Sequence, residues 1–128
     1  MMNEETEKRR VKQDLSRRTK EFALRVVRLY CSLPKTTEAQ VLGKQMLRSG
    51  TSVGAHYREA VRARSIAEFI SKVEGGLQEL EETGYWLELL IESHIVPQAK
   101  LVESCKEADG LTAISVSSVR TAKQHRPR

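Results

Sequence analysis

Apolar side chains recur at helical intervals along most of this 128-residue chain, and that periodicity constrains the fold more than any other feature. Four successive segments show this helical spacing, and no strand-like alternation of useful length occurs. Residues spaced by three, four or seven positions lie on one face of a helix. The sequence therefore predicts an all-α protein. In the first segment these residues are Leu15, Phe22, Val26, Leu29 and Leu33.

Prolines and capping signals set the ends of the predicted helices. Pro34 ends the first helix, and Pro97 suits the first turn of the fourth. Two further stretches match a capping box, in which a Ser or Thr is followed three residues later by Glu or Gln. These boxes begin at Thr37 and Ser65, so they open the second and third helices.

Short connections between four amphipathic helices favour one compact arrangement. We expect an antiparallel up-down-up-down four-helix bundle over residues 14–120. A charged N-terminus (1–13) and a basic tail (121–128) are expected to be disordered, because neither supplies core residues. The predicted helices are 14–33, 37–63, 66–93 and 97–120.

The charge of the chain is distributed unevenly. The formal net charge is +5, but residues 1–64 carry 15 Lys and Arg against 7 Asp and Glu. Residues 65–128 carry 7 against 10. One half can therefore present a cationic surface and the other an acidic one. This balance permits an anionic partner without establishing one.

Cysteine usage and hydropathy bear on the compartment. Cys31 and Cys105 form no CxxC and no metal-ligand spacing, which favours two small core residues in a reducing cytosol. The charged N-terminus lacks the apolar run of a signal peptide. No apolar stretch approaches the ~20 residues that span a bilayer. We therefore expect a soluble, cytoplasmic protein without a membrane partner.

The stretch LRSGTSVGAHYREA, residues 47–60, places poor helix formers inside the second predicted helix. Glycine there costs roughly 0.8–1 kcal/mol relative to alanine, so a compensating benefit is expected. Small side chains let another backbone approach closely. We expect such packing inside the bundle and against a second subunit, through Gly50, Thr51, Gly54 and Ala55. The alternative is a kinked helix whose Ser and Thr hydroxyls bond back to carbonyls.

Cationic residues form a second stripe beside the apolar one, about 100° around the second helix. With the arginines of the first helix they can neutralise phosphates without reading bases. The alternatives are a solvated face or pairing with the glutamates of the third helix. The candidate nucleic-acid-binding residues are Arg17, Arg18, Arg25, Arg28, Lys44, Arg48, Arg58 and Arg62.

The sequence holds no catalytic or metal-binding pattern. A di-iron bundle would need Glu-x-x-His pairs, and none of the three histidines is preceded by Glu at that spacing. No glycine-rich phosphate loop follows a strand. Tyr85 and Trp86 either stack a base or belong to the core or an interface. We expect no enzymatic activity, no metal and no cofactor.

Three stretches together resemble one bacterial family: VLGKQMLRSGTSVGAHYREA, FISKVEGGLQELEETGYWLELL and the ending VRTAK. The family consists of small four-helix-bundle proteins first noted as products of intervening sequences in large-subunit ribosomal RNA genes. The resemblance covers roughly residues 22–123, and Leu33 with Pro34 supplies the family's turn after the first helix. One departure is His56 with Tyr57, where a small polar residue and a branched apolar one are expected.

The resemblance implies a ring-shaped homo-oligomer, commonly a pentamer, and no enzymatic activity. It also implies kinship with the accessory variability determinants of diversity-generating retroelements, which are basic pentamers that bind nucleic acid and associate with a reverse transcriptase. The leading hypothesis is an oligomeric protein that binds RNA or DNA. The alternative is a scaffold that docks a partner such as a reverse transcriptase. In a ring, Arg48, Arg58 and Arg62 would pair with a neighbour's acidic third helix.

Overall fold

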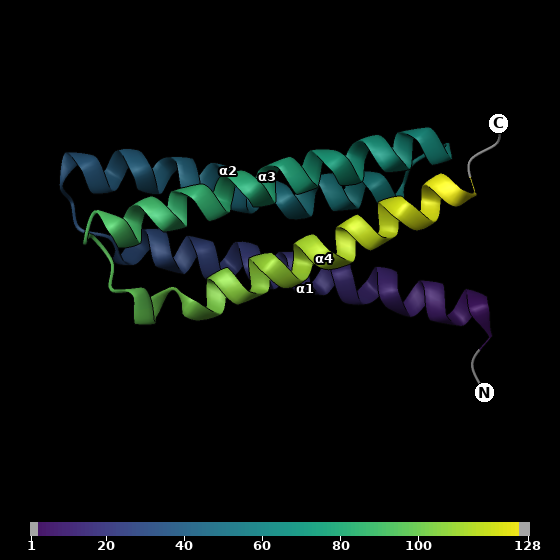
Figure 1. Cartoon of the computed structure of the whole chain (residues 1–128), viewed down its shortest axis with the longest axis horizontal. Coiled ribbons are helices and arrows are strands. Elements are labelled where there is room, and N and C mark those ends of the chain that lie inside the picture. The colour runs from purple at the N-terminus through teal and green to yellow at the C-terminus, as the bar shows by residue number, and fades with distance from the viewer. Residues whose placement is uncertain (1–2, 126–128) are drawn as a thin grey trace.

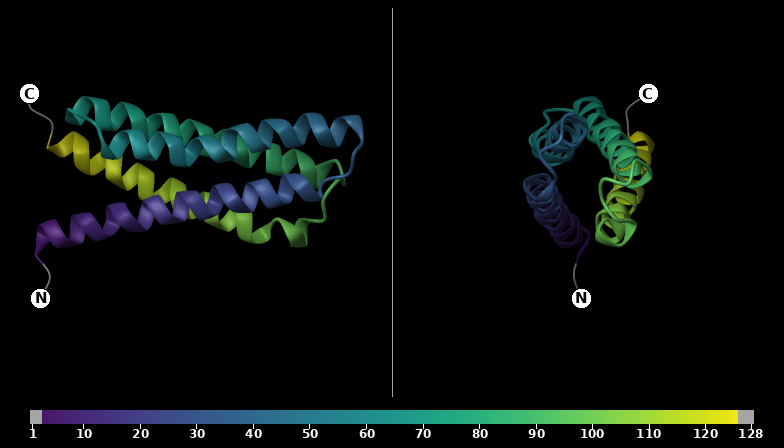
Figure 2. Two further views of the ribbon diagram at one scale, coloured as in Figure 1. Left: turned by 180° about the vertical axis from the view of Figure 1, so that it is seen from behind. Right: turned by 90° about the vertical axis from the view of Figure 1, so that its left-hand side faces the viewer.

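The computed structural model describes residues 3–125, apart from the side chains of residues 11 and 13, and shows four antiparallel helices (Figure 1). The described range contains no β-strand, and both of its ends lie at the same end of the bundle (Figure 2). The predicted all-α four-helix bundle is confirmed. Its elements are α1 (Glu4–Ser32), α2 (Thr37–Val61), α3 (Ile66–Glu92), the 3-10 turn η1 (Gln98–Lys100) and α4 (Val102–Gln124).

The first helix begins ten residues earlier than expected. Residues 4–13 belong to α1, which corrects the prediction of disorder there. The Asn3 side chain caps the helix by accepting a 2.8 Å hydrogen bond from the Thr6 N–H. Three glutamates in the first turn suit the positive end of the helix dipole. These polar signals sustain a helix that has little apolar periodicity of its own.

The last helix likewise runs past its expected end. Residues 121–124 continue α4, so the expected tail is helical up to Gln124. His125 caps the end of α4, and residues 126–128 of that tail lie outside the described residues, as do residues 1–2. At its start, Pro97 precedes the short turn η1, and α4 itself begins only at Val102.

One predicted cap, Ser65, is confirmed, although Glu68 bonds one residue before it, and the other, Thr37, is wrong. Ser65 Oγ accepts a 3.0 Å hydrogen bond from the Glu68 N–H, and Glu68 reaches back to the Arg64 N–H. At α2 the capping residue is Thr36 rather than Thr37, because the Thr36 side chain accepts from the Ala39 N–H. Thr37 is already the first helical residue.

The core lies along the axis of the bundle and is mostly aliphatic. Its largest fully buried side chains include Phe22, Met46 and Leu87, one from each of the first three helices. A buried hydroxyl pair joins α2 to α3, with Thr83 Oγ1 donating to Ser49 Oγ at 2.8 Å. Each hydroxyl also bonds to a carbonyl of its own helix, Thr83 to that of Glu79 and Ser49 to that of Met46, so both polar groups are satisfied inside the core.

The two cysteines differ from each other in position. Cys105 is half-buried and packs against the core, and burial raises the pKa of its thiol. Cys31 is exposed on α1, so the prediction of two core cysteines is wrong for Cys31. Its helix turns the buried Val26 and Leu33 to the core instead.

Helices α1 and α4 cross and then separate toward the chain termini, as Figures 1 and 2 show from opposite sides. The bundle is therefore closed where α1 turns into α2 and more open at its other end. An open groove between α1 and α4 results, and it is described below.

Candidate nucleic-acid interface

The small residues of α2 are used first for packing inside the chain. Gly50 is buried, and a β-carbon on it would lie 2.8 Å from Val26 Cγ2 of α1. A β-carbon on Gly54 would lie 3.4 Å from Thr19 Oγ1, also on α1. The two glycines thus allow the close approach of α1 and α2, as expected for packing within the bundle.

The outer side of the same segment is available to another molecule. Ala55 is exposed and Thr51 is half-buried. The hydroxyls of Thr51 and Ser52 bond back to the carbonyls of Leu47 and Arg48, each at 2.7 Å. The hydroxyl-to-carbonyl hydrogen bonds that we expected of a kinked helix therefore occur together with close packing. The role of this segment in a subunit contact stays a prediction, carried by Thr51 and Ala55, since Gly50 faces α1 of its own chain.

Three of the eight candidate cations are held by carboxylates of the same chain. Arg18 makes two hydrogen bonds to Glu107 of α4, at 2.7 and 3.2 Å, and this contact raises the pKa of Arg18. Arg17 pairs with Asp14 at 2.6 Å within α1. A guanidinium that is already paired has fewer donors left for a phosphate.

Arg48 bridges α2 to α3. Its guanidinium lies 3.2 Å from a Glu79 carboxylate oxygen and 2.6 Å from one of Glu82. The hydrogen bond to Glu82 is the main reason that the pKa of Arg48 is raised. The expected pairing with a neighbouring subunit is corrected for this residue, because Arg48 finds α3 of its own chain.

The other five candidate cations are exposed, and within the described part of the chain they have no carboxylate partner. We call them the free cations. They come from α1 and α2. Lys44 and Arg58 are 14 positions apart on α2, so a rise of about 1.5 Å per residue places them about 21 Å apart. The free cations are Arg25 and Arg28 on α1, and Lys44, Arg58 and Arg62 on α2.

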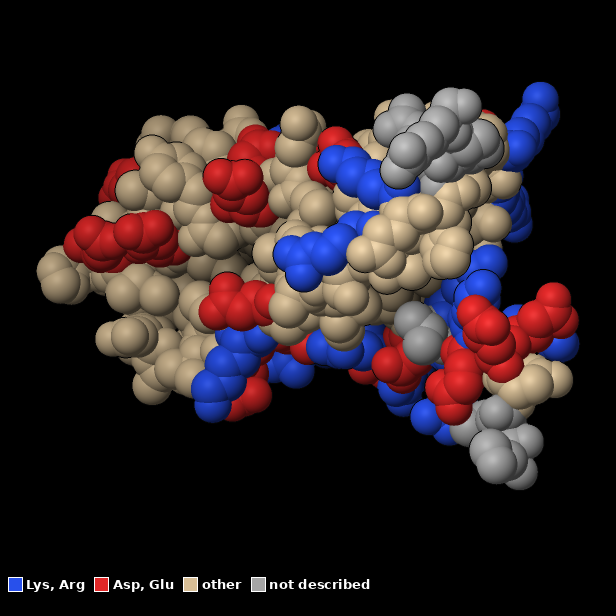
Figure 3. Space-filling view, turned by 45° about the vertical axis from the view of Figure 1, so that its right-hand side comes forward, with Lys and Arg blue, Asp and Glu red and all other residues tan. Residues whose placement is uncertain are grey.

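The free cations do not form a single patch. Arg25 lies seven residues after Arg18, hence on nearly the same side of α1, and Arg18 reaches α4. The α2 side of α1 is instead marked by Val26 and Thr19, which pack against its glycines. Arg25 is therefore turned away from the side of α1 that packs on α2, whereas Arg58 and Arg62 are neighbours one turn apart on α2. On the face in Figure 3, basic and acidic side chains are interspersed.

The second half of α3 is acidic. Residues 73–93 contain six glutamates and no Lys or Arg. Glu81, Glu88 and Glu92 are exposed on the same helix face as Tyr85, whose exposed fraction is 53%. Tyr85 stands edge-on to Trp86, with 5.1 Å between the ring centroids. Trp86 packs against the core, which is one of the roles that the sequence left open.

The unusual pair His56 and Tyr57 fills two different spaces. The His56 ring lies against α3, since a β-carbon on Gly75 would be 2.9 Å from it. Tyr57 is buried at the open end of the bundle, and burial raises its pKa to about 12. Its hydroxyl donates a long hydrogen bond of 3.4 Å to the Lys12 carbonyl.

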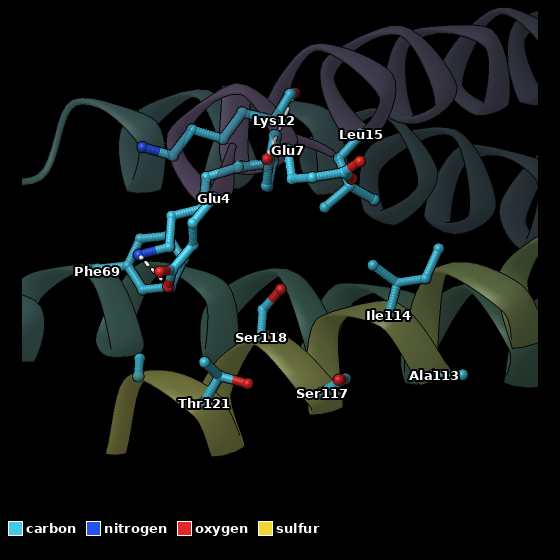
Figure 4. Close-up of a pocket in the computed structure, with 13 residues that line it drawn as sticks. Glu4, Glu7, Lys12, Leu15, Phe69, Ala113, Ile114, Ser117, Ser118 and Thr121 are labelled. Atoms are coloured by element: carbon cyan, nitrogen blue, oxygen red, sulfur yellow. Dashed lines mark hydrogen bonds and ion pairs between the residues drawn. The ribbon is translucent and has the colours of Figure 1, made fainter. Parts of the chain in front are cut away.

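The groove between α1 and α4 has a volume of about 600 Å³. Leu15, Tyr57, Phe69 and Ile114 line its apolar part, and hydroxyl-bearing residues of α4 form one wall (Figure 4). Glu4 reaches toward Phe69 from the opposite wall (Figure 4). The sequence did not indicate this groove, because it depends on the angle at which two distant helices cross.

The described residues offer no assembled metal or membrane-spanning site. Within them, no three His, Cys, Asp or Glu side chains are grouped to hold a metal ion. None of their helices combines the length and the apolar character needed to cross a membrane.

Comparison with known proteins places this geometry in a family. The model of the family described as 23S rRNA-intervening sequence protein matches residues 12–117. The chain belongs to the 23S rRNA-intervening sequence protein family. The match includes the whole of α2 and α3 and most of α1 and α4.

A solved structure supports the same assignment. It is a crystal structure from Bacteroides thetaiotaomicron, described as a protein of unknown function from the S23 ribosomal protein family. Its identity with this intervening-sequence protein is 37%, and the TM-score is 0.80. The alignment covers 85% of this chain and 97% of the other. A search among curated proteins found no match.

Proposed function

We propose that this intervening-sequence protein is a non-enzymatic, homo-oligomeric accessory protein that binds RNA or DNA through the phosphate backbone. The observation that carries the proposal is the set of five free cations. They stand on rigid helices, are exposed, and have no carboxylate partner within the described residues. Cations in this state release the counterions of phosphates on binding, which is the main source of sequence-independent affinity.

The division between free and paired cations refines the interface. Arg17, Arg18 and Arg48 lose their place as primary contacts, because each already holds a carboxylate at 2.6–2.7 Å. Arg58 and Arg62 are neighbours on the surface of α2, so they offer two phosphate contacts at one point. We therefore assign the strongest contact to this pair.

Assembly is part of the proposal. The exposed Ala55 and the half-buried Thr51 supply a low, uncharged surface on α2 between cations. A second copy bound there would multiply the cationic sites. The family resemblance implies such an assembly, a ring that is commonly a pentamer. Such an oligomer would act in the cytoplasm. We expect light scattering to give a mass several times 14.5 kDa, and Ala55→Arg to lower that mass while circular dichroism is unchanged.

The experiment on binding removes the cationic pair. Arg58→Gln with Arg62→Gln is expected to weaken binding to a labelled nucleic acid in fluorescence anisotropy. The slope of log K against log salt should become shallower by up to about two, because each lost contact contributes about 0.9 for B-DNA. The matched control is Lys100→Gln with Lys106→Gln, which changes the net charge equally at two exposed positions elsewhere.

The control separates local contacts from net charge. If both double variants weaken binding equally, the contacts do not lie at Arg58 and Arg62. Failure of the natural chain to bind any RNA or DNA at low ionic strength would contradict the proposed function itself.

The second candidate is a scaffold that docks a protein such as a reverse transcriptase. It is favoured by the exposed Tyr85 among the glutamates of α3, a surface that repels phosphate and suits a cationic protein. Capture of one purified reverse transcriptase that survives nuclease, and that is lost in Tyr85→Lys, would support it.

A further inference from the structure

None of the six aromatic side chains presents an exposed ring on α1 or α2, the helices that carry the free cations. Trp86 of α3 is half-buried and packs against the core. Phe22 and Tyr57 are buried, and Tyr30 is half-buried with its hydroxyl donating to Gln40 at 3.0 Å. Phe69 lines the groove between α1 and α4. The whole set lies within the described residues, and the outer surfaces of α1 and α2 therefore carry cations without an exposed ring.

Among the aromatic side chains, all of which lie in the described residues, only Tyr85 is more than half exposed, and acidic side chains surround it. Tyr85 has Glu81 four residues before it and Glu88 three residues after it, both exposed on the same face of α3. Within the described part of the chain, neither glutamate has a cationic partner. A single strand stacked on Tyr85 would bring its phosphates close to two carboxylates, so this ring is a poor platform for bases.

We infer that the nucleic acid bound by the free cations is double-helical, an inference that rests on the proposed function. Proteins that hold single strands combine a cationic track with aromatic rings on which bases stack, at about 1–3 kcal/mol per base. Here the cations are present, and no exposed ring stands on the helices that carry them. A duplex hides its bases and presents only phosphates and groove edges, so it loses nothing by the absence of rings.

The rigidity of the cationic sites favours the same ligand. Lys44 and the pair Arg58 with Arg62 are held about 21 Å apart on one helix, and α2 is packed against α1 and α3 along its length. A duplex is already ordered, so its phosphates can meet both points without further loss of conformational freedom. A flexible single strand must be straightened to reach both, which reduces its affinity.

The test compares a duplex with its own strands. Fluorescence anisotropy at one fixed low salt would use a 20-base-pair DNA, the same sequence as RNA, and each separated strand, chosen not to self-pair. We expect both duplexes to bind at least about tenfold more tightly than their strands, because a duplex carries the higher charge density and releases more counterions per contact, about 0.9 against about 0.7 for a single strand. Comparable affinity of the DNA and RNA duplexes assigns the contact to phosphates, and preference for one of them assigns it to groove shape as well.

Two variants make the result decisive. Tyr85→Ala is expected to leave every affinity unchanged, while Arg58→Gln with Arg62→Gln weakens the duplexes. Single strands that bind as tightly as the duplex, or that lose affinity in Tyr85→Ala, would overturn the inference and leave the proposed function in place. Failure of every nucleic acid to bind would contradict the proposed function instead.

Discussion

At the scale of single residues, Gly50 shows how one missing side chain decides the approach of two helices. A β-carbon on Gly50 would press against Val26 of α1, whereas Gly84 of α3 has open space where a β-carbon would be. Both are helical, so both carry the same intrinsic cost of glycine. The difference between them is packing alone, and this makes them a matched pair.

We predict opposite effects of alanine at these two positions. Gly50→Ala should lower the free energy of unfolding by about 1–3 kcal/mol, because the methyl group overpacks the contact with Val26. Gly84→Ala should raise it by about 0.5–1 kcal/mol. Urea unfolding at one protein concentration measures both. A stabilising Gly50→Ala would mean that α1 and α2 approach less closely than described.

Tyr57 gives the molecule a specific alkaline sensitivity. Burial raises its pKa to about 12, above the value near 10 of an unfolded tyrosine. The unfolded chain therefore releases this proton first as pH rises, and stability is lost between about pH 10 and 12. Tyr57→Phe should lose less stability over that window than the natural chain. Thermal unfolding of both chains at pH 9 and at pH 11.5 measures this loss. An equal loss of stability in Tyr57→Phe and in the natural chain between the two pH values would contradict the assigned burial.

At the scale of elements, polar caps rather than apolar residues decide where the helices begin. The chain offers Thr36 and Thr37 in succession before α2, and only Thr36 is extended with its oxygen toward the Ala39 N–H. The same logic starts α1 at Asn3. A cap is local chemistry, so its contribution can be tested one residue at a time.

Adjacent threonines provide that test. Thr36→Ala should destabilise the protein by about 1 kcal/mol, because a helix N–H loses its acceptor. Thr37→Ala should change stability by less than about 0.5 kcal/mol, since alanine suits the first turn of a helix. Chemical denaturation of the two variants compares them directly. The reverse order would restore Thr37 as the capping residue.

These elements also show what a sequence can and cannot predict. The helices with apolar stripes were predicted within a few residues, because their periodicity is written in the chain. The start of α1 was missed by ten residues, because residues 4–14 have polar caps and charges in place of that stripe. For Arg48 the sequence left open a choice between a nucleic acid and the glutamates of the third helix. The structure shows the second, with Glu79 and Glu82. Periodicity could not decide this, because the pairing depends on how α2 lies against α3.

At the scale of the whole molecule, the bundle is uneven in its internal support. The pair α2 and α3 is joined along its length by core contacts, a buried hydroxyl pair and the bridges of Arg48. Helix α1 is bridged to α4 by the ion pair of Arg18 with Glu107, and toward the chain termini the two helices separate around the groove. The candidate cations of α2 therefore stand on the best-supported part of the fold.

This unevenness predicts a gradient of hydrogen exchange. Amides of residues 4–14 should exchange fastest among the helical segments, and those in the middle of α2 and α3 slowest, because local opening is governed by buried packing. Mass spectrometry of the exchanging protein over seconds to hours measures the order. Protection of residues 4–14 equal to that of α2 would contradict an open groove in solution and show that another surface covers it. Repeating the measurement on diluted protein would then distinguish a second copy, whose protection falls with concentration, from contact within one chain.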